Sequence, residues 1–376
     1  MLMIIQVLQE NLSNAITTTS RFASVKAQLP VLANILLSAK KNKLIISATN
    51  LEMSVSLSIG AKVKKDGEIT VPARVINDLV NNLKAGQINL SSEKERLKIK
   101  TSGFNSQISG MNSSDFPKIP HSISGKSIDM VKEDFYSSLS QVLFSVSVDE
   151  TRPVLTGVLV IMDKNGLTMV STDGFRLSQK KLGVKTGKES EGKIIIPKNT
   201  LSELLRLSDG EKNVKFLIDK KENQVMFGIS DTVLTSRIIE GEFPDFERII
   251  PKESKINISV DKEELLRAIK LASVFARESA NVVRLTVKKN SLEVTAESSQ
   301  SGSQETEVDA KVETDTNISK KGFVIAFNYR FLEDFLNATG GDDVRIEFSE
   351  ENAPGVFLDP KDKDFLHIIM PVRLND

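Results

Sequence analysis

Cysteine is absent from the 376 residues, and histidine occurs only twice, as His121 and His367. The first absence excludes disulfides, thiolate nucleophiles and cysteine-based zinc or iron–sulfur sites. The second leaves almost nothing for a multi-histidine metal site or a Ser-His-Asp triad. No apolar run reaches the roughly 18 residues of a spanning helix, and no basic segment leads into a signal-peptide core. We therefore expect a soluble intracellular protein with little catalytic chemistry and no cofactor, metal or membrane association.

The charge of the chain is balanced in total but not along its length. The sequence has 50 basic and 50 acidic side chains, for a net charge of zero. Residues 1–125 carry 15 basic and 8 acidic side chains (+7), residues 126–251 carry 18 and 19 (−1), and residues 252–376 carry 17 and 23 (−6). A positive head and a negative tail would favour head-to-tail pairing of two copies. An unevenly charged, solvated surface is the alternative interpretation.

A polar turn followed by a β-branched strand occurs three times, at residues 41–49, 164–172 and 289–297. Asn42, Asn165 and Asn290 mark the turns and lie 123 and 125 residues apart. An apolar strand precedes each turn, so each copy predicts a hairpin.

Two helical patterns repeat in the same order as the hairpins. One begins at Pro72, Pro197 and Asn328 and has an apolar–x–acid–apolar–apolar core; we expect Gly86, Gly210 and Gly340 or Gly341 to end these helices. The other covers residues 12–23, 135–146 and 265–276. The repetition predicts an α+β fold of three tandem similar domains, each with two helices on a β-sheet, at residues 1–125, 126–251 and 252–376.

Several longer strings resemble those of the bacterial sliding-clamp family, the beta subunits of DNA polymerase III. They are LPVLANILL, ATNLEMSV, VPAR, TRPVLTGVLV, VSTDGFRLS, EGEFPDFERIIP and IIMPVRL, in the order and spacing of that family. The resemblance covers essentially the whole chain. It implies the DNA clamp fold, closed as a head-to-tail dimeric ring that encircles duplex DNA, with helices lining the hole and a continuous sheet outside.

The resemblance also implies a pore lined with cations that hold phosphates weakly and without regard to sequence. Lys26 and Arg74 match positions where the family touches DNA, and Lys26 would act as a point charge. The helix candidates supply Arg21, Lys26, Arg74, Lys84, Lys198, Arg206, Arg267, Lys270 and Arg277. For each cation alone, a solvated helix face is the alternative.

A pocket for short linear motifs of partner proteins is implied as well. Asp173-Gly174 predicts a two-residue hairpin, which in the family forms one wall of this pocket. The implied lining is Arg152, Leu155, Thr172, Gly174, Phe175, Arg176, Leu177, Pro244, Arg248, Ile249, Ile368, Met370, Pro371, Val372, Arg373 and Leu374. Its aliphatic members would accept Leu and Phe anchors, and its arginines would form the rim. Alternatively, Met370 and Val372 belong to a terminal strand packed on its own domain.

The resemblance places Phe104 opposite Val274 and Phe275 across the seam between two copies. It implies as partners duplex DNA, the catalytic subunit of the replicative polymerase, an ATP-dependent clamp loader, and other polymerases and repair proteins. We expect the protein in the cytoplasm, at the nucleoid and the replication fork.

Two rival hypotheses remain open from the sequence. An enzyme is the first, but no GxxxxGK[ST] phosphate loop or metal-ligand spacing accompanies the many carboxylates, so we expect a non-catalytic processivity factor. A three-domain protein-binding scaffold that does not encircle DNA is the second.

Overall fold

The computed structural model describes residues 2–24, 29–186, 191–207, 210–314 and 322–373. The chain forms two compact units. The first combines Met1–Lys132 with Asn199–Ile238, and the second combines Glu133–Lys198 with Ile239–Asp376. Among the described residues, no helix is both long and apolar enough to cross a membrane.

The first unit contains two antiparallel sheets and the helices α1 (Gln9–Ser20) and α2 (Ala73–Asn81), and it takes in α4 (Lys198–Arg206) from Asn199 onward. The five-stranded sheet has the order β5-β1-β7-β8-β9, with β1 (Ile4–Leu8), β5 (Lys62–Lys65), β7 (Gln87–Glu93), β8 (Arg96–Thr101) and β9 (Phe104–Ser109). The eight-stranded sheet has the order β10-β15-β16-β17-β4-β3-β2-β6, with β2 (Asn34–Lys40), β3 (Lys43–Thr49), β4 (Met53–Gly60), β6 (Gly67–Pro72), β10 (Ile128–Val131), β15 (Asn213–Asp219), β16 (Gln224–Ile229) and β17 (Thr232–Arg237).

The second unit contains one antiparallel sheet of 12 strands in the order β14-β11-β12-β13-β25-β24-β23-β18-β21-β20-β19-β22. Its strands are β11 (Gly157–Asp163), β12 (Gly166–Thr172), β13 (Arg176–Leu182), β14 (Gly192–Pro197), β18 (Ile256–Asp261), β19 (Val282–Val287), β20 (Ser291–Ser298), β21 (Gly302–Thr314), β22 (Phe323–Asn328), β23 (Asp343–Phe348), β24 (Gly355–Asp359) and β25 (Asp362–Ile369). The helices α5 (Lys262–Ala276) and α6 (Tyr329–Ala338) belong here, as does α3 (Lys132–Leu143) from Glu133 onward.

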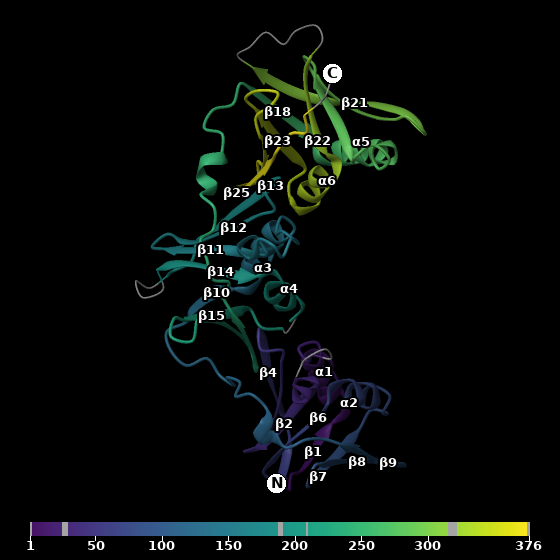
Figure 1. Cartoon of the computed structure of the whole chain (residues 1–376), viewed down its shortest axis with the longest axis vertical. Helices are drawn as coiled ribbons and strands as arrows, with labels where there is room; N and C mark the ends of the chain where they lie inside the picture. Colours follow the sequence, from purple (N-terminus) through teal and green to yellow (C-terminus); the bar gives the residue numbers. More distant parts are fainter. Residues whose placement is uncertain (1, 25–28, 187–190, 208–209, 315–321, 374–376) are drawn as a thin grey trace. The chain divides into compact units, whose positions relative to one another are not determined.

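The helices form where an apolar stripe follows a polar first turn. In α5, the Asp261 side chain accepts a hydrogen bond from the Glu264 N–H at 2.8 Å and so caps the helix. Leu265, Ile269 and Ala272 then turn one buried face toward the strands of the sheet. Figure 1 shows α5 and α6 beside the strands of the C-terminal domain.

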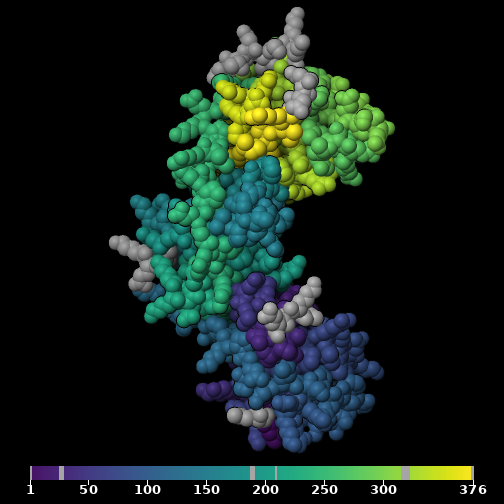
Figure 2. Space-filling view, in the orientation of Figure 1, coloured from purple at the N-terminus to yellow at the C-terminus, as the bar shows by residue number. Residues whose placement is uncertain are grey.

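The sheet of the second unit is continuous because β13 pairs with β25. The register runs over five residue pairs, from Arg176 opposite Ile369 to Lys180 opposite Phe365. Figure 2 shows the yellow surface of the C-terminal domain directly against the teal surface of the middle domain at this place. The pairing brings the chain's C-terminal strand to the turn between β12 and β13.

The predicted α+β fold with three tandem domains and two helices in each is confirmed. The predicted helix starts at residues 12, 135 and 265 lie three residues too late, because the polar first turns of α1, α3 and α5 carry no apolar periodicity. The predicted glycine helix end is wrong for α2, because Asn82 is its C-cap and Gly86 lies further along the chain. In α6 the C-cap is Thr339, and Gly340 directly follows it, where the terminating glycine was expected. The domain boundaries at 125 and 251 stay a prediction.

Candidate functional site

The turn between β12 and β13, residues Thr172–Leu177, is here called the DG hairpin. Thr172 pairs with Leu177, so four residues separate the paired positions and the predicted two-residue turn is wrong. The reason is the Asp173 carboxylate, whose Oδ1 accepts the N–H groups of Phe175 at 2.9 Å and Arg176 at 3.0 Å and widens the turn. Gly174 has a φ of +93°, which glycine adopts without strain.

The threonine at the start of the DG hairpin completes this bonding pattern. The Thr172 hydroxyl donates to the Arg176 carbonyl at 2.6 Å and accepts the Gly174 N–H at 3.1 Å. The turn is therefore held by its own side chains. Phe175, at its tip, is 63% exposed.

Arg176 anchors the DG hairpin to the C-terminal domain. Its Nη1 lies 2.6 Å from Oδ2 of Asp334 on α6, and its Nε lies 3.0 Å from Oδ2 of Asp173. Its Nη2 donates to the Phe144 carbonyl at 2.7 Å, and its guanidinium lies 4.5 Å from the ring centroid of Phe331. The side chain is only 10% exposed. The prediction that it forms the rim of an open pocket therefore needs correction, because its hydrogen bonds are used inside the protein.

The C-terminal segment continues past β25 along the DG hairpin. The Met370 N–H donates to the Phe175 carbonyl at 2.8 Å, and the Val372 N–H donates to the Ala326 carbonyl at 2.8 Å. Met370 and Val372 are exposed, and Pro371 between them is half-buried. Leu374 lies outside the described residues.

Of the remaining aliphatic residues predicted to line the pocket, three are buried and one is exposed. Leu177 and Ile368 face each other across β13 and β25 and belong to a closed core together with Phe246. Leu155 is also buried, in a short 3-10 helix. Phe246 and its partly buried neighbours pack on Leu177 and Ile368 and cover them. All three predicted lining residues are therefore buried, which corrects the prediction that they form an open cleft. Ile249, in contrast, is exposed.

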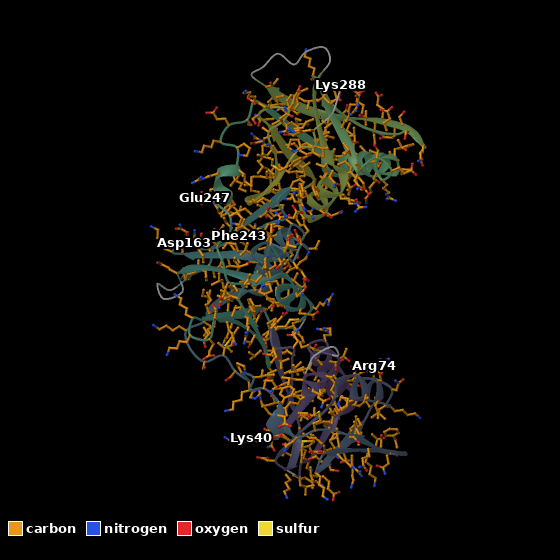
Figure 3. The ribbon with its side chains drawn as sticks, viewed as in Figure 1. Lys40, Arg74, Asp163, Phe243, Glu247 and Lys288 are labelled. Carbon is orange, nitrogen blue, oxygen red and sulfur yellow. The ribbon has the colours of Figure 1, made fainter. Side chains whose placement is uncertain are left out.

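The connecting segment between the middle and C-terminal domains carries the other predicted residues. Pro244 and Arg248 are exposed, and Arg248 Nε lies 2.6 Å from Asp245 Oδ2. Figure 3 labels Phe243 and Glu247 of this segment. Arg152 lies above the DG hairpin, since a Cβ added at Gly174 would be 3.4 Å from its Nη1. The structure thus brings exposed Phe175, Met370 and Arg152 together at the hairpin.

Val372 and Arg373 also line a hollow of about 620 Å³ in the C-terminal domain, together with Arg284, Glu297 and Glu305. The sequence did not indicate these last three residues. Their strands β19, β20 and β21 come together only through the sheet topology.

The cations predicted to contact DNA differ in their surroundings. Arg74 on α2 is 89% exposed and lies 3.8 Å from Asp78 one turn later; Figure 3 shows its place on that helix. Arg267, Lys270 and Arg277, on α5 or at its C-terminal cap, are exposed. Lys26 lies outside the described residues.

The two cations of α4 that were predicted to contact DNA are restricted, one by an ion pair and one by partial burial. Arg206 Nη1 lies 2.5 Å from Glu203 Oε1, and the other oxygen of that carboxylate lies 2.8 Å from Arg21 Nε. Lys198 is half-buried, and burial, assisted by the neighbouring Arg176, lowers the pKa of its ammonium group. Lys198 therefore belongs to the charged cluster behind the DG hairpin, which makes it a weaker phosphate ligand than Arg74.

The residues predicted at the seam lie on separate elements. Phe104 begins β9, the edge strand of the five-stranded sheet, and is half-buried. Val274 is 58% exposed on α5, whereas Phe275 packs against the core of its own domain. An edge strand and an exposed aliphatic side chain are features of a surface that pairs with another chain.

Two polar links between the middle and C-terminal domains, one at Asp362 and one at His367, could not be predicted from the sequence. At the first link, Lys180 Nζ lies 2.6 Å from Asp362 Oδ1, and Gln141 Nε2 donates to Asp362 Oδ2 at 2.9 Å. Burial raises the pKa of Asp362, but these two hydrogen bonds outweigh it and hold that pKa below its ordinary value.

The second link is formed by His367, which is fully buried and bonded through Nδ1 to the Ser178 hydroxyl at 2.8 Å. Burial lowers the pKa of His367 well below its ordinary value, and Arg176 adds to this effect. Strand periodicity could have shown that the histidine is buried, since Phe365, His367 and Ile369 share one face of β25. In the described part of the chain, no group of three or more His, Asp or Glu side chains is placed to hold a metal ion.

Comparison with known proteins matches one family along nearly the whole chain. Models of the N-terminal, central and C-terminal domains of the DNA polymerase III beta subunit match residues 3–120, 129–245 and 247–373. The beta sliding clamp of Staphylococcus epidermidis is 30% identical over 373 residues, covering 96% of this chain and 96% of that protein.

Solved structures agree with the sequence matches. The beta subunit of DNA polymerase III from Thermotoga maritima superimposes with a TM-score of 0.89 at 26% identity, covering 99% of this chain and 100% of that one. The beta sliding clamp of C. crescentus gives 0.92 at 27% identity and covers 99% of both chains. Since three domain models follow one another along nearly the whole sequence, the chain belongs to the bacterial sliding-clamp family, the beta subunits of DNA polymerase III.

Proposed function

We propose that the two surfaces described above serve the sliding-clamp function of this family. The cations of α2 and α5 face duplex DNA inside a head-to-tail homodimeric ring, and the surface around the DG hairpin receives partner proteins. The observation that carries the proposal is the match of all three clamp domains, in order, along the chain.

Weak binding of phosphates suits a protein that must slide. Arg74, Arg267, Lys270 and Arg277 are exposed single charges on helices, so each exchanges one phosphate for the next at little cost. Topological enclosure, and not affinity, then keeps the ring on DNA. A scaffold that does not encircle DNA would have no use for this arrangement.

The partner surface combines exposed apolar groups with a fixed backbone. Phe175, Ile249, Met370 and Val372 are exposed, and they accept Leu and Phe anchors of short linear motifs. Partners that carry such motifs include the replicative polymerase, other polymerases and repair proteins. Arg152 and Arg248 contribute charge at the edge of this surface.

The protein acts as a processivity factor and carries out no chemical step itself. Opening and closing of the ring draw on an ATP-dependent clamp loader, since the sequence has no phosphate loop of its own. The site of action is the replication fork in the cytoplasm.

Retention on DNA of different topology tests the proposal. The protein is loaded with clamp loader and ATP on a nicked circular plasmid, isolated by gel filtration, and the plasmid is then cut once. We expect the protein to stay on the circle and to leave after linearisation. Equal retention before and after the cut would contradict encirclement and favour the scaffold hypothesis.

A further inference from the structure

A hollow of about 180 Å³ lies in the first unit, far from the DG hairpin in sequence. One wall is the turn between β3 and β4, residues 49–54, here called the NL hairpin after Asn50-Leu51. The segment 117–120 forms another wall, and Gln224 with residues 235–237 forms the third.

The NL hairpin repeats the hydrogen bonds of the DG hairpin one by one. Asn50 Oδ1 accepts the N–H groups of Glu52 at 3.0 Å and Met53 at 2.9 Å, as Asp173 does in the DG hairpin. The Thr49 hydroxyl donates to the Met53 carbonyl at 3.0 Å and accepts the Leu51 N–H at 3.0 Å, as Thr172 does. The internal repeat therefore extends to the turn that borders the proposed partner surface.

The strand after each hairpin, β4 or β13, also pairs in the same way with a strand from later in the chain. The Arg237 N–H donates to the Glu52 carbonyl at 2.9 Å, just as the Met370 N–H donates to the Phe175 carbonyl at 2.8 Å. β17 pairs with β4 in the way that β25 pairs with β13. The hollow thus occupies, at the junction of the first and middle domains, the place that the partner surface occupies at the next junction.

The two hairpins differ at one position that bears on binding. Leu51 has a φ of +75° where the DG hairpin has glycine, and its side chain is 48% exposed. A left-handed conformation costs a residue other than glycine about 1–2 kcal/mol. Glycine would avoid this cost, so the strained position presents an exposed aliphatic side chain beside the hollow.

One residue that lines the hollow, Thr235, has a buried hydroxyl without a hydrogen-bond partner among the described residues. The residue is 4% exposed. A ligand that supplies an acceptor would satisfy a group that is already desolvated. Lys118 and Arg237 line the same hollow against one acid, Glu52, so the local charge favours a carboxylate as the acceptor.

We propose that this hollow is a second peptide-docking site, which takes an extended partner segment with an aliphatic side chain beside a carboxylate. Its volume lies below the roughly 300–1,000 Å³ of small-molecule pockets, so it holds one anchoring side chain with its backbone. The site goes beyond the proposed function, although the comparison with the DG hairpin rests on the docking role proposed there.

Methyl NMR of protein labelled at its nine methionines tests the proposal. Met53 lines the hollow, and Met370 lies at the DG hairpin. The probes are acetyl-Asp-Leu-amide and its uncharged counterpart acetyl-Asn-Leu-amide, each titrated to millimolar concentration. We expect a saturable shift of the Met53 methyl with the Asp probe and at least about fivefold weaker binding of the Asn probe.

Matched variants locate the contact. Thr235→Val should weaken the Met53 response about tenfold, while Thr232→Val, equally buried on the same strand but outside the hollow, should leave it unchanged. Leu51→Gly relieves the strain and removes the aliphatic wall, so this variant folds and should also lose the response. An unmoved Met53 signal, or equal effects of the two threonine variants, would overturn the proposal. The Met370 signal reports separately on the proposed partner surface.

Discussion

The guanidinium of Arg176 lies 2.6 Å from the carboxylate of Asp334, 158 residues later in the chain. We expect Asp334→Asn to lower the free energy of unfolding by about 1–3 kcal/mol, because a largely buried cation loses its charged acceptor. Chemical denaturation followed by circular dichroism measures the change. Glu333→Gln, on the same helix, is the matched control. Equal midpoints for both variants would contradict the anchoring role of Arg176.

The exposed cations should dominate DNA binding. We expect Arg74→Glu or Arg267→Glu to weaken direct binding of the unloaded protein to linear duplex DNA and to reduce the salt dependence of that binding by about one unit of slope for each phosphate that is no longer neutralised. Lys198→Ala should change both quantities less, since that ammonium belongs to the cluster behind the DG hairpin. An equal or larger effect of Lys198→Ala would refute this ranking.

Partner affinity should depend on the exposed apolar groups near the hairpin. Met370→Ala should weaken binding of a peptide with Leu and Phe anchors about tenfold, since truncation of an interface anchor costs about 1–2 kcal/mol. Val148→Ala removes an exposed valine from the same unit and serves as the control. Fluorescence anisotropy with a labelled peptide gives both affinities. Unchanged affinity in Met370→Ala would exclude this side chain as an anchor.

The seam should be sensitive to charge. We expect Phe104→Arg and Val274→Arg to yield monomers in sedimentation velocity at low micromolar concentration, because a charge cannot be buried there without a partner. Phe275→Arg should do the same, with additional loss of stability, since Phe275 packs on its own core. Val131→Arg, at another exposed valine, should remain dimeric. Dimers in all four variants would show that the seam lies elsewhere.

Acid should weaken the fold through His367. Its pKa in the folded protein lies well below the ordinary value of about 6.5, so the unfolded chain binds the proton first. This contribution to stability is complete above pH about 6.5 and declines below it, by at most about 1.4 kcal/mol per pH unit for one group. His367→Asn, which keeps an acceptor for Ser178, should flatten the dependence of the unfolding midpoint on pH.

The second histidine supplies the control for that experiment. His121 is exposed, unlike His367, and is bonded through Nδ1 to Ser56; its partial desolvation lowers its pKa as well. His121→Asn should therefore remove a smaller part of the acid sensitivity than His367→Asn. The reverse order would mean that the buried imidazole of β25 does not control acid stability.

The repeat in the sequence was sufficient to predict the fold because hairpins and amphipathic helices are local patterns. The segments around Asn42, Asn165 and Asn290 each form the turn that was expected between two paired strands. Termini of elements were less accurate, since capping by Asp261 or Asn82 depends on geometry that spacing alone does not reveal.

The candidate site was predicted less completely, because its geometry depends on residues far apart in the sequence. Nothing near Arg176 in the sequence indicates that Asp334 and Phe331 occupy its hydrogen bonds and its cationic face. Likewise, the aliphatic spacing of Leu177 and Ile368 is the same for a closed core and for an open cleft. The pairing of β13 with β25 and the packing of Phe246 on both strands decide between them.

That pairing has a mechanical consequence. A partner that pulls on the DG hairpin along the direction of its strands loads five antiparallel residue pairs of β13 and β25 at once. Backbone hydrogen bonds in such a ladder run across the strands, so they share the load in shear and do not open one after another. If a polymerase docks at the DG hairpin, as proposed, a pull along these strands would load the ladder in shear and would not peel the C-terminal domain away from the middle one.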